Sequence, residues 1–121
     1  MAEETNFKKR VQKFLDEKGI WSVKYFANAY TKAGIPDTLC CITGGKFMAI
    51  ELKAENGRPS DLQEMNLKDI EELGGFGILL YPSGFKRFKK EIEHYMKYDL
   101  FLIPNCNGYV KFKRGWYEWF W

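Results

Sequence analysis

Two charged side chains near the end of an apolar stretch could do metal-ion chemistry. Residues 46–54 are predicted to form a strand, and side chains alternate between its two faces. Glu51 and Lys53 therefore project together from one face. A surface ion pair is the more common interpretation of an isolated E-x-K sequence. A second carboxylate beside the pair would favour a metal site instead.

Asp37 is the candidate for that second carboxylate. It follows Pro36, whose ring fixes the backbone angle φ and helps to aim the next residue. The Gly44-Gly45 pair predicts a hairpin between strands 38–43 and 46–54. That hairpin would return Asp37 to the end of strand 46–54, where oxygen ligands could converge on Mg²⁺. A simple turn before a strand is the alternative interpretation.

The register of this hairpin decides whether the two carboxylates share a face. A two-residue turn at Gly44-Gly45 would place Asp37 opposite Leu52 and turn it away from Glu51. A shared site requires a shift by one residue, through a bulge near the glycines or a bend at Pro36. We expect such a shift.

Two predicted helices contribute further polar candidates. The helix over 60–73 opens with Ser60 as N-cap and Gln63 at N3, which is a capping box. Gln63 also lies near the edge of the inward face, so capping and a role in the site both remain open. The helix over 5–18, continued backwards, places Glu4 on the apolar face. The alternative for Glu4 is a favourable interaction with the helix dipole.

The predicted elements make an α/β sandwich around a mixed sheet. In order they are helix 5–18, strands 20–27, 38–43 and 46–54, helix 60–73, strand 76–81 and helix 83–97. Strand 46–54, its following helix and strand 76–81 form a βαβ unit. Residues 98–121 carry nine aromatic residues and a hairpin signal at Asn107-Gly108. We expect one domain over 1–121, with a core over about 1–97 and an aromatic C-terminal extension over 98–121.

Composition limits the classes of function. The 121 residues hold 19 Lys+Arg and 16 Asp+Glu, and the net charge of +3 permits nucleic acid without arguing for it. A single His and three Cys without a CxxC disfavour the common zinc sites and a disulfide framework. No apolar run approaches the roughly 20 residues that cross a bilayer. We expect a cytoplasmic protein with no membrane partner and no nucleotide cofactor.

Four segments together resemble the PD-(D/E)XK nuclease superfamily, and more closely its VRR-NUC branch. They are GIPD at 34–37, FMAIELK at 47–53, GRPSDLQ at 57–63 and GG at 74–75, preceded by a similar first helix. The resemblance spans about residues 3–85 and looks like the short stand-alone versions found in bacteriophages and bacteria. It implies a restriction-endonuclease-like αβββαβ core with a mixed central sheet flanked by helices.

The resemblance also implies a metal-dependent DNA endonuclease. Asp37 and Glu51 would bind Mg²⁺ or Mn²⁺, with the Leu52 main-chain carbonyl assisting and Glu4 as an outer carboxylate. Lys53 would position or activate the attacking water, and Gln63 would support the site. Branched DNA, such as a Holliday junction or a flap, is a frequent substrate of the family, and homodimers occur among its small members. A phage-encoded member would act in the cytoplasm of its bacterial host.

Contacts to DNA and the alternatives complete the sequence-based hypothesis. The candidate phosphate contacts are Lys24, Lys32, Lys46, Arg58 and Ser60, and each of the basic residues is more often an ordinary surface charge. One alternative is a nucleic-acid-binding module with weak or no catalysis, whose aromatic extension stacks on single-stranded bases. Another makes the extension an adaptor for a second protein. The Asp/Glu/Lys set favours the enzyme, and we expect residues 109–121 to contribute to a homodimer interface.

Overall fold

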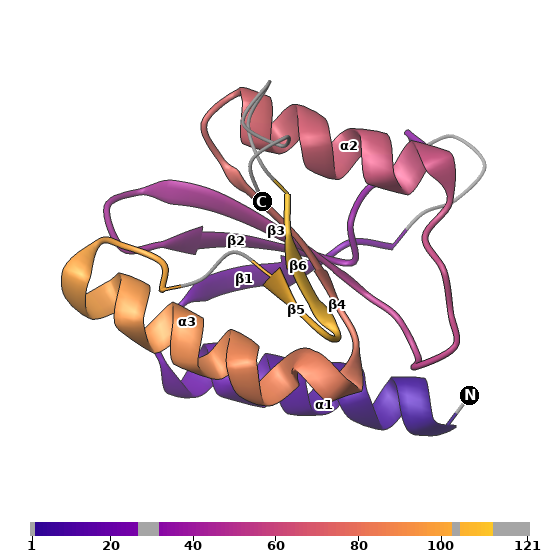
Figure 1. The fold of residues 1–121 in the computed structure, drawn as a ribbon, viewed down its shortest axis with the longest axis horizontal. Helices are drawn as coiled ribbons and strands as arrows, with labels where there is room; N and C mark the ends of the chain where they lie inside the picture. The colour runs from indigo at the N-terminus through magenta and orange to yellow at the C-terminus, as the bar shows by residue number, and fades with distance from the viewer. Residues whose placement is uncertain (1, 27–31, 103–104, 113–121) are drawn as a thin grey trace.

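The computed structural model describes residues 2–26, 32–102 and 105–112, with side chains from Thr5 onward. Its elements surround a single sheet (Figure 1). They are α1 (Ala2–Glu17), β1 (Trp21–Lys24), β2 (Thr38–Ile42), β3 (Lys46–Leu52), α2 (Asp61–Glu72), β4 (Phe76–Leu80), the 3₁₀ turn η1 (Pro82–Gly84), α3 (Phe85–Tyr98), β5 (Asn105–Cys106) and β6 (Tyr109–Lys111). The predicted succession of helices and strands up to α3 is confirmed.

The sheet is mixed, as predicted. Its six described strands lie in the order β1-β2-β3-β4-β6-β5. β3 and β4 are parallel and are connected through α2, whereas the other described pairs are antiparallel. Parallel strands end at the same edge of a sheet, so the loops after β3 and β4 lie side by side.

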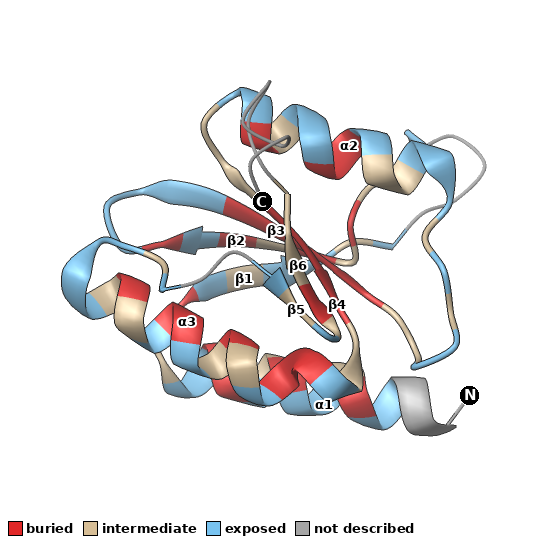
Figure 2. Cartoon of the chain, viewed as in Figure 1, coloured by how far each residue is buried: buried red, intermediate tan, exposed pale blue. Residues whose placement is uncertain are grey.

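Helices cover both faces of the sheet. α1 and α3 lie together on one face and α2 lies on the other (Figure 1). The larger apolar core fills the space toward α1 and α3, where it includes Met48 and Ile50 of β3. Ala49 belongs instead to a smaller cluster that includes Leu67 of α2. The alternation predicted for β3 is therefore confirmed, and Figure 2 shows the buried residues on the strands and inner helix faces.

The β2–β3 hairpin has the shifted register that a shared site requires. Thr38 pairs with Ile50, and the last pair joins Ile42 to Lys46. The turn therefore has three residues, 43–45, rather than two. Gly44 and Gly45 both have positive φ, at 84° and 73°, which glycine adopts without steric cost. Continued by one residue beyond β2, this register sets Asp37 opposite Glu51.

Part of the predicted C-terminal extension belongs to the sheet. The hairpin predicted at Asn107-Gly108 is confirmed, since Cys106 pairs with Tyr109 across it. β6 then pairs with β4, and Tyr109 is fully buried against Phe88. Residues 105–112 are thus part of the folded body, and residues 113–121 lie outside the described residues.

Candidate functional site

Asp37 is held against the end of β3 by main-chain hydrogen bonds. Its Oδ2 accepts a hydrogen bond from the Leu52 N–H at 2.8 Å, and its carbonyl accepts one from the Tyr25 N–H at 2.8 Å. In a strand, the N–H and C=O of one residue lie on the same side. The Leu52 carbonyl therefore also faces the side of β3 where Asp37 lies.

Glu51 is a buried carboxylate at the same place. Its side chain is 2% exposed, and its Oε2 lies 3.3 Å from Lys53 Nζ. Its Oε1 has no hydrogen-bond partner among the described residues. Burial and the neighbouring Asp37 raise the pKa of Glu51 to about 7, although Lys53 acts in the opposite direction. An unpaired carboxylate oxygen beside a second carboxylate is suited to sharing a proton or a cation.

Two lysines flank the carboxylates. Lys53 directly follows β3, where its N–H donates to the Leu80 carbonyl at 3.0 Å, and its side chain is largely buried. Lys8 of α1 lies on the other side, with its Nζ 3.7 Å from Asp37 Oδ1. Lys8 is not among the candidates predicted from the sequence. Its position one helical turn after Glu4 was the available signal, because residues i and i+4 share a helix face.

A small cavity opens beside Asp37. Its volume is about 160 Å³, and its lining residues come from α1, from the ends of β1 and β3, and from the start of β2. They are Lys8, Lys24, Tyr25, Phe26, Asp37, Thr38 and Leu52. Lys24, a predicted phosphate contact, therefore lines the same cavity as Asp37.

The loop before Asp37 is fixed to α2. Buried Asn66 donates from Nδ2 to the Gly34 carbonyl at 2.8 Å and to the Ala33 carbonyl at 3.3 Å. Gly34 has φ 76°, and a Cβ there would lie 2.7 Å from Leu62 Cγ. The loop thus lies so close to α2 that only glycine fits at position 34 without a shift of its neighbours. Asn66 is also not among the candidates predicted from the sequence. The only sign of its role there is a polar residue among the apolar residues of the predicted helix 60–73.

The capping box predicted at the start of α2 is confirmed. Ser60 Oγ accepts from the Gln63 N–H at 3.1 Å, and Gln63 Oε1 accepts from the Ser60 N–H at 2.8 Å. These bonds engage the Ser60 hydroxyl and the Gln63 carbonyl oxygen. Support of the metal site by Gln63, and a phosphate contact by Ser60, remain predictions.

The other predicted contacts are spread over the surface. Exposed Arg58 lines a second cavity of about 280 Å³ in the loop region after β3 and β4. Lys32 is exposed near the loop that leads to Asp37. Lys46 starts β3, five residues before Glu51, which is about 17 Å away along an extended strand. The structure does not bring Lys46 to the carboxylates, and the side chain of Glu4 lies outside the described residues.

The donors present fit a hard divalent cation. Within the described residues, no group of three or more His, Cys, Asp or Glu side chains could share a metal ion. Asp37 and Glu51 nevertheless supply two carboxylates, and the Leu52 carbonyl faces the same side. Mg²⁺ is commonly bound through one or two carboxylates, with water or substrate oxygens completing its octahedron. The unpaired Oε1 of Glu51 is the atom that such an ion would satisfy.

No family model, curated protein or solved structure matches the chain. Among the described helices, none is long and apolar enough to cross a membrane.

Proposed function

We propose that the chain is a Mg²⁺- or Mn²⁺-dependent DNA endonuclease with a restriction-endonuclease-like core. The observation that carries the proposal is the buried Glu51, whose unpaired Oε1 lies beside Asp37 and whose other oxygen contacts Lys53. A protein that only needed stability would gain little from two adjacent carboxylates, since burying an incompletely paired charge is costly.

Each of these groups would have a role in phosphodiester hydrolysis. A bound divalent ion would neutralise charge on the phosphate and supply an activated water. Asp37 and Glu51 would hold that ion at the end of β3. Lys53 would orient the attacking water, and Lys8 would contact a phosphate oxygen. The hydrogen bond from the Leu52 N–H fixes Asp37 for this purpose.

The mixed sheet and its flanking helices support the family proposal. The order α1-β1-β2-β3-α2-β4 agrees with an αβββαβ core, and the candidate residues lie where β3 ends. We extend the proposal to branched DNA as substrate and to a homodimer as the active form. Paired cuts on a symmetric junction need two copies of a single-site chain, related by a two-fold axis.

A second candidate is a single-strand-binding module with weak catalysis. It is favoured by Phe26, which is 80% exposed and lines the cavity beside Asp37 together with Tyr25. Exposed aromatic rings can stack on unpaired bases. Tight binding of single strands without cutting would favour this candidate over the nuclease.

One assay tests the proposed function. Labelled duplex, flap and four-way-junction DNA are incubated with the chain in Mg²⁺, Mn²⁺ or EDTA. We expect metal-dependent cutting by the native chain, and a loss of about 100-fold or more in Glu51→Ala and Lys53→Ala, because both side chains belong to the site. Exposed Lys68 of α2 gives the control Lys68→Ala, which should cut normally. Failure of the native chain to cut any substrate, or near-normal cutting by either site variant, would overturn the proposal.

A further inference from the structure

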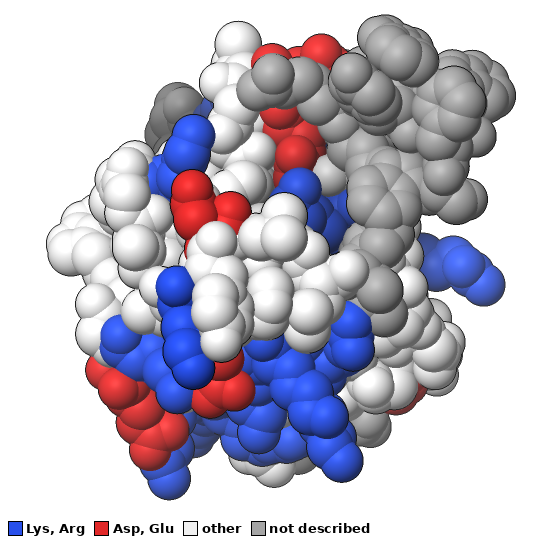
Figure 3. Space-filling model, turned by 60° about the vertical axis from the view of Figure 1, so that its left-hand side comes forward, with Lys and Arg blue, Asp and Glu red and all other residues white. Residues whose placement is uncertain are grey.

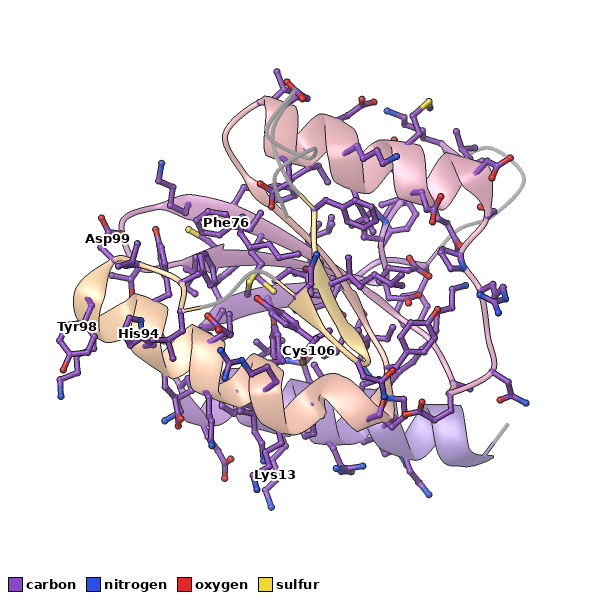
Figure 4. The ribbon with its side chains drawn as sticks, in the orientation of Figure 1. Lys13, Phe76, His94, Tyr98, Asp99 and Cys106 are labelled. Carbon is purple, nitrogen blue, oxygen red and sulfur yellow. The ribbon has the colours of Figure 1, made fainter. Side chains whose placement is uncertain are left out.

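A basic surface extends across α1 and α3. It consists of six side chains in the first three quarters of α1 and the first half of α3: Lys9, Arg10, Lys13, Lys86, Lys89 and Lys90. Five of the six are exposed, and Lys89 is half-buried. Figure 3 shows lysine and arginine gathered over the lower part of the molecule, where α1 and α3 lie. Lys13 points away from the sheet, below α1 (Figure 4).

The cations of this surface form no ion pairs within the described part of the protein. None of the six forms an ion pair with a described side chain. Two of them converge from different helices on one ring, with Arg10 Cζ 5.1 Å and Lys89 Nζ 4.7 Å from the centroid of Phe85. The face of an aromatic ring attracts cations, so Phe85 helps to hold two like charges near each other.

Acidic residues adjoin one part of the basic surface. A hollow of about 410 Å³ is lined by Lys86, Lys89 and Lys90 of this surface together with Glu17, Lys18 and Glu93. There Lys18 forms an ion pair with Glu93 at 2.7 Å. These carboxylates therefore adjoin the lysines of α3, whereas Lys9, Arg10 and Lys13 of α1 do not line this hollow.

The topology puts this surface at the same edge of the sheet as the candidate site. β3 and β4 are parallel, so the end of β4 lies beside the end of β3 that carries Glu51, and α3 begins five residues after β4. The first half of α1 lies there too, because Lys8 contacts Asp37. The basic surface and the carboxylates thus lie toward the same edge of the sheet, with the basic surface on the side of α1 and α3.

We propose that the α1–α3 surface binds the phosphate backbone of the DNA that the candidate site cuts, on one side of the scissile bond. This inference rests on the proposed function. A duplex carries one negative charge per roughly 1.7 Å of its axis, which several unpaired cations on one surface complement. Lysine and arginine contacts of this kind position the duplex without reading its sequence.

The test measures binding of the full chain to duplex and junction DNA in EDTA, by fluorescence anisotropy over a range of salt concentrations. Lys13→Gln/Lys90→Gln removes one exposed charge from each helix. Lys68→Gln/Lys97→Gln is the matched control, since it removes two exposed charges elsewhere. We expect the first variant to bind about tenfold or more weakly at ~0.1 M salt, with the slope of log K against log salt smaller by about 2. The control should bind like the native chain.

The outcomes separate this inference from the nuclease proposal. Equal affinities and slopes for the two double variants would overturn the inference, even if the native chain cuts DNA. A selective loss in Lys13→Gln/Lys90→Gln would support the surface even if no metal gave cutting. Anionic vesicles containing phosphatidylserine form a further arm, and tighter binding to them than to DNA would also overturn the inference.

Discussion

Glu51 and Asp37 lie together because the hairpin register places them so, and because the Leu52 N–H holds Asp37 in position. Lys53 offsets part of the charge on Glu51 without removing the effect of burial. The E-x-K spacing could be predicted from the alternation of a strand. Burial of Glu51 and its unpaired oxygen could not, because both depend on how the β2–β3 hairpin and α2 pack around it.

The raised pKa of Glu51 predicts a pH dependence of stability. Its pKa is about 7 in the folded protein against an ordinary 4.5, so the folded state retains a proton that the unfolded state has lost. The contribution of the protonated Glu51 to the free energy of unfolding is complete below about pH 4.5 and is lost as the pH rises to about 7. In EDTA, we expect the free energy of unfolding of the native chain, relative to Glu51→Gln, to fall by up to about 3 kcal/mol across this range. Urea unfolding at several pH values measures it, and a difference that is constant with pH would contradict the raised pKa.

At the scale of elements, helix α2 contributes both a cap and an anchor. The capping box could be predicted from Ser60 and Gln63 alone, since its pattern is local. The anchor could not, because Asn66 reaches residues more than 30 positions earlier in the chain. The three-residue turn at 43–45 lies between these cases. Gly44 and Gly45 predict a turn from the sequence. The one-residue shift in strand register was predicted only because a shared site requires Asp37 and Glu51 on the same face.

The cap predicts how substitutions at Gln63 behave. We expect Gln63→Ala to lose about 1 kcal/mol of unfolding free energy, and Gln63→Glu to lose little, because glutamate serves equally at N3. Thermal unfolding measures the stabilities, and the cleavage assay is run beside it. A drop in cutting by Gln63→Glu at unchanged stability would show that Gln63 also supports the metal site.

The close approach of the Asp37 loop to α2 predicts a different result at Gly34. Gly34→Ala adds a Cβ 2.7 Å from Leu62 Cγ, at a residue with φ 76°. Gly19→Ala is the matched control, because Gly19 has a similar φ of 70° and no atom lies within 4 Å of a Cβ placed there. We expect the control to cost about 1–2 kcal/mol through its positive φ. Gly34→Ala should cost more and should also weaken Mn²⁺ binding, because the loop that carries Asp37 must move. Equal losses in the two variants would contradict this role for the loop.

At the scale of the whole molecule, the sheet extends further along the chain than the resemblance reaches. β6 pairs with β4, β5 pairs with β6, and Tyr109 is buried in the core. The hairpin at Asn107-Gly108 could be predicted from its turn residues. Its pairing with β4 could not, because nothing in a short strand specifies a partner about 30 residues away. Packing of Tyr109 and Phe112 in the two apolar clusters accounts for part of the aromatic content of residues 98–121.

Truncation separates the structural part of the C-terminal extension from its assembly role. A chain ending at Phe112 keeps β6, and we expect it to fold. A chain ending at Asn107 loses Tyr109 from the core and should be destabilised by several kcal/mol, as large buried aromatics are when removed. Light scattering on the full chain and on the chain ending at Phe112 tests the proposed homodimer. A monomeric full chain, or a dimer unaffected by removal of 113–121, would rule out a contribution of these residues to assembly.

Direct measurement of Mn²⁺ binding tests the central claim, that Asp37 and Glu51 form a metal site. Electron paramagnetic resonance counts the free Mn²⁺ in titrations of the native chain, Asp37→Asn and Glu51→Gln. Asp69→Asn is the charge-matched control, because Asp69 is exposed on α2. We predict a site in the native chain that is lost in both site variants and retained in Asp69→Asn. Native-like Mn²⁺ binding by Asp37→Asn and Glu51→Gln would contradict the account.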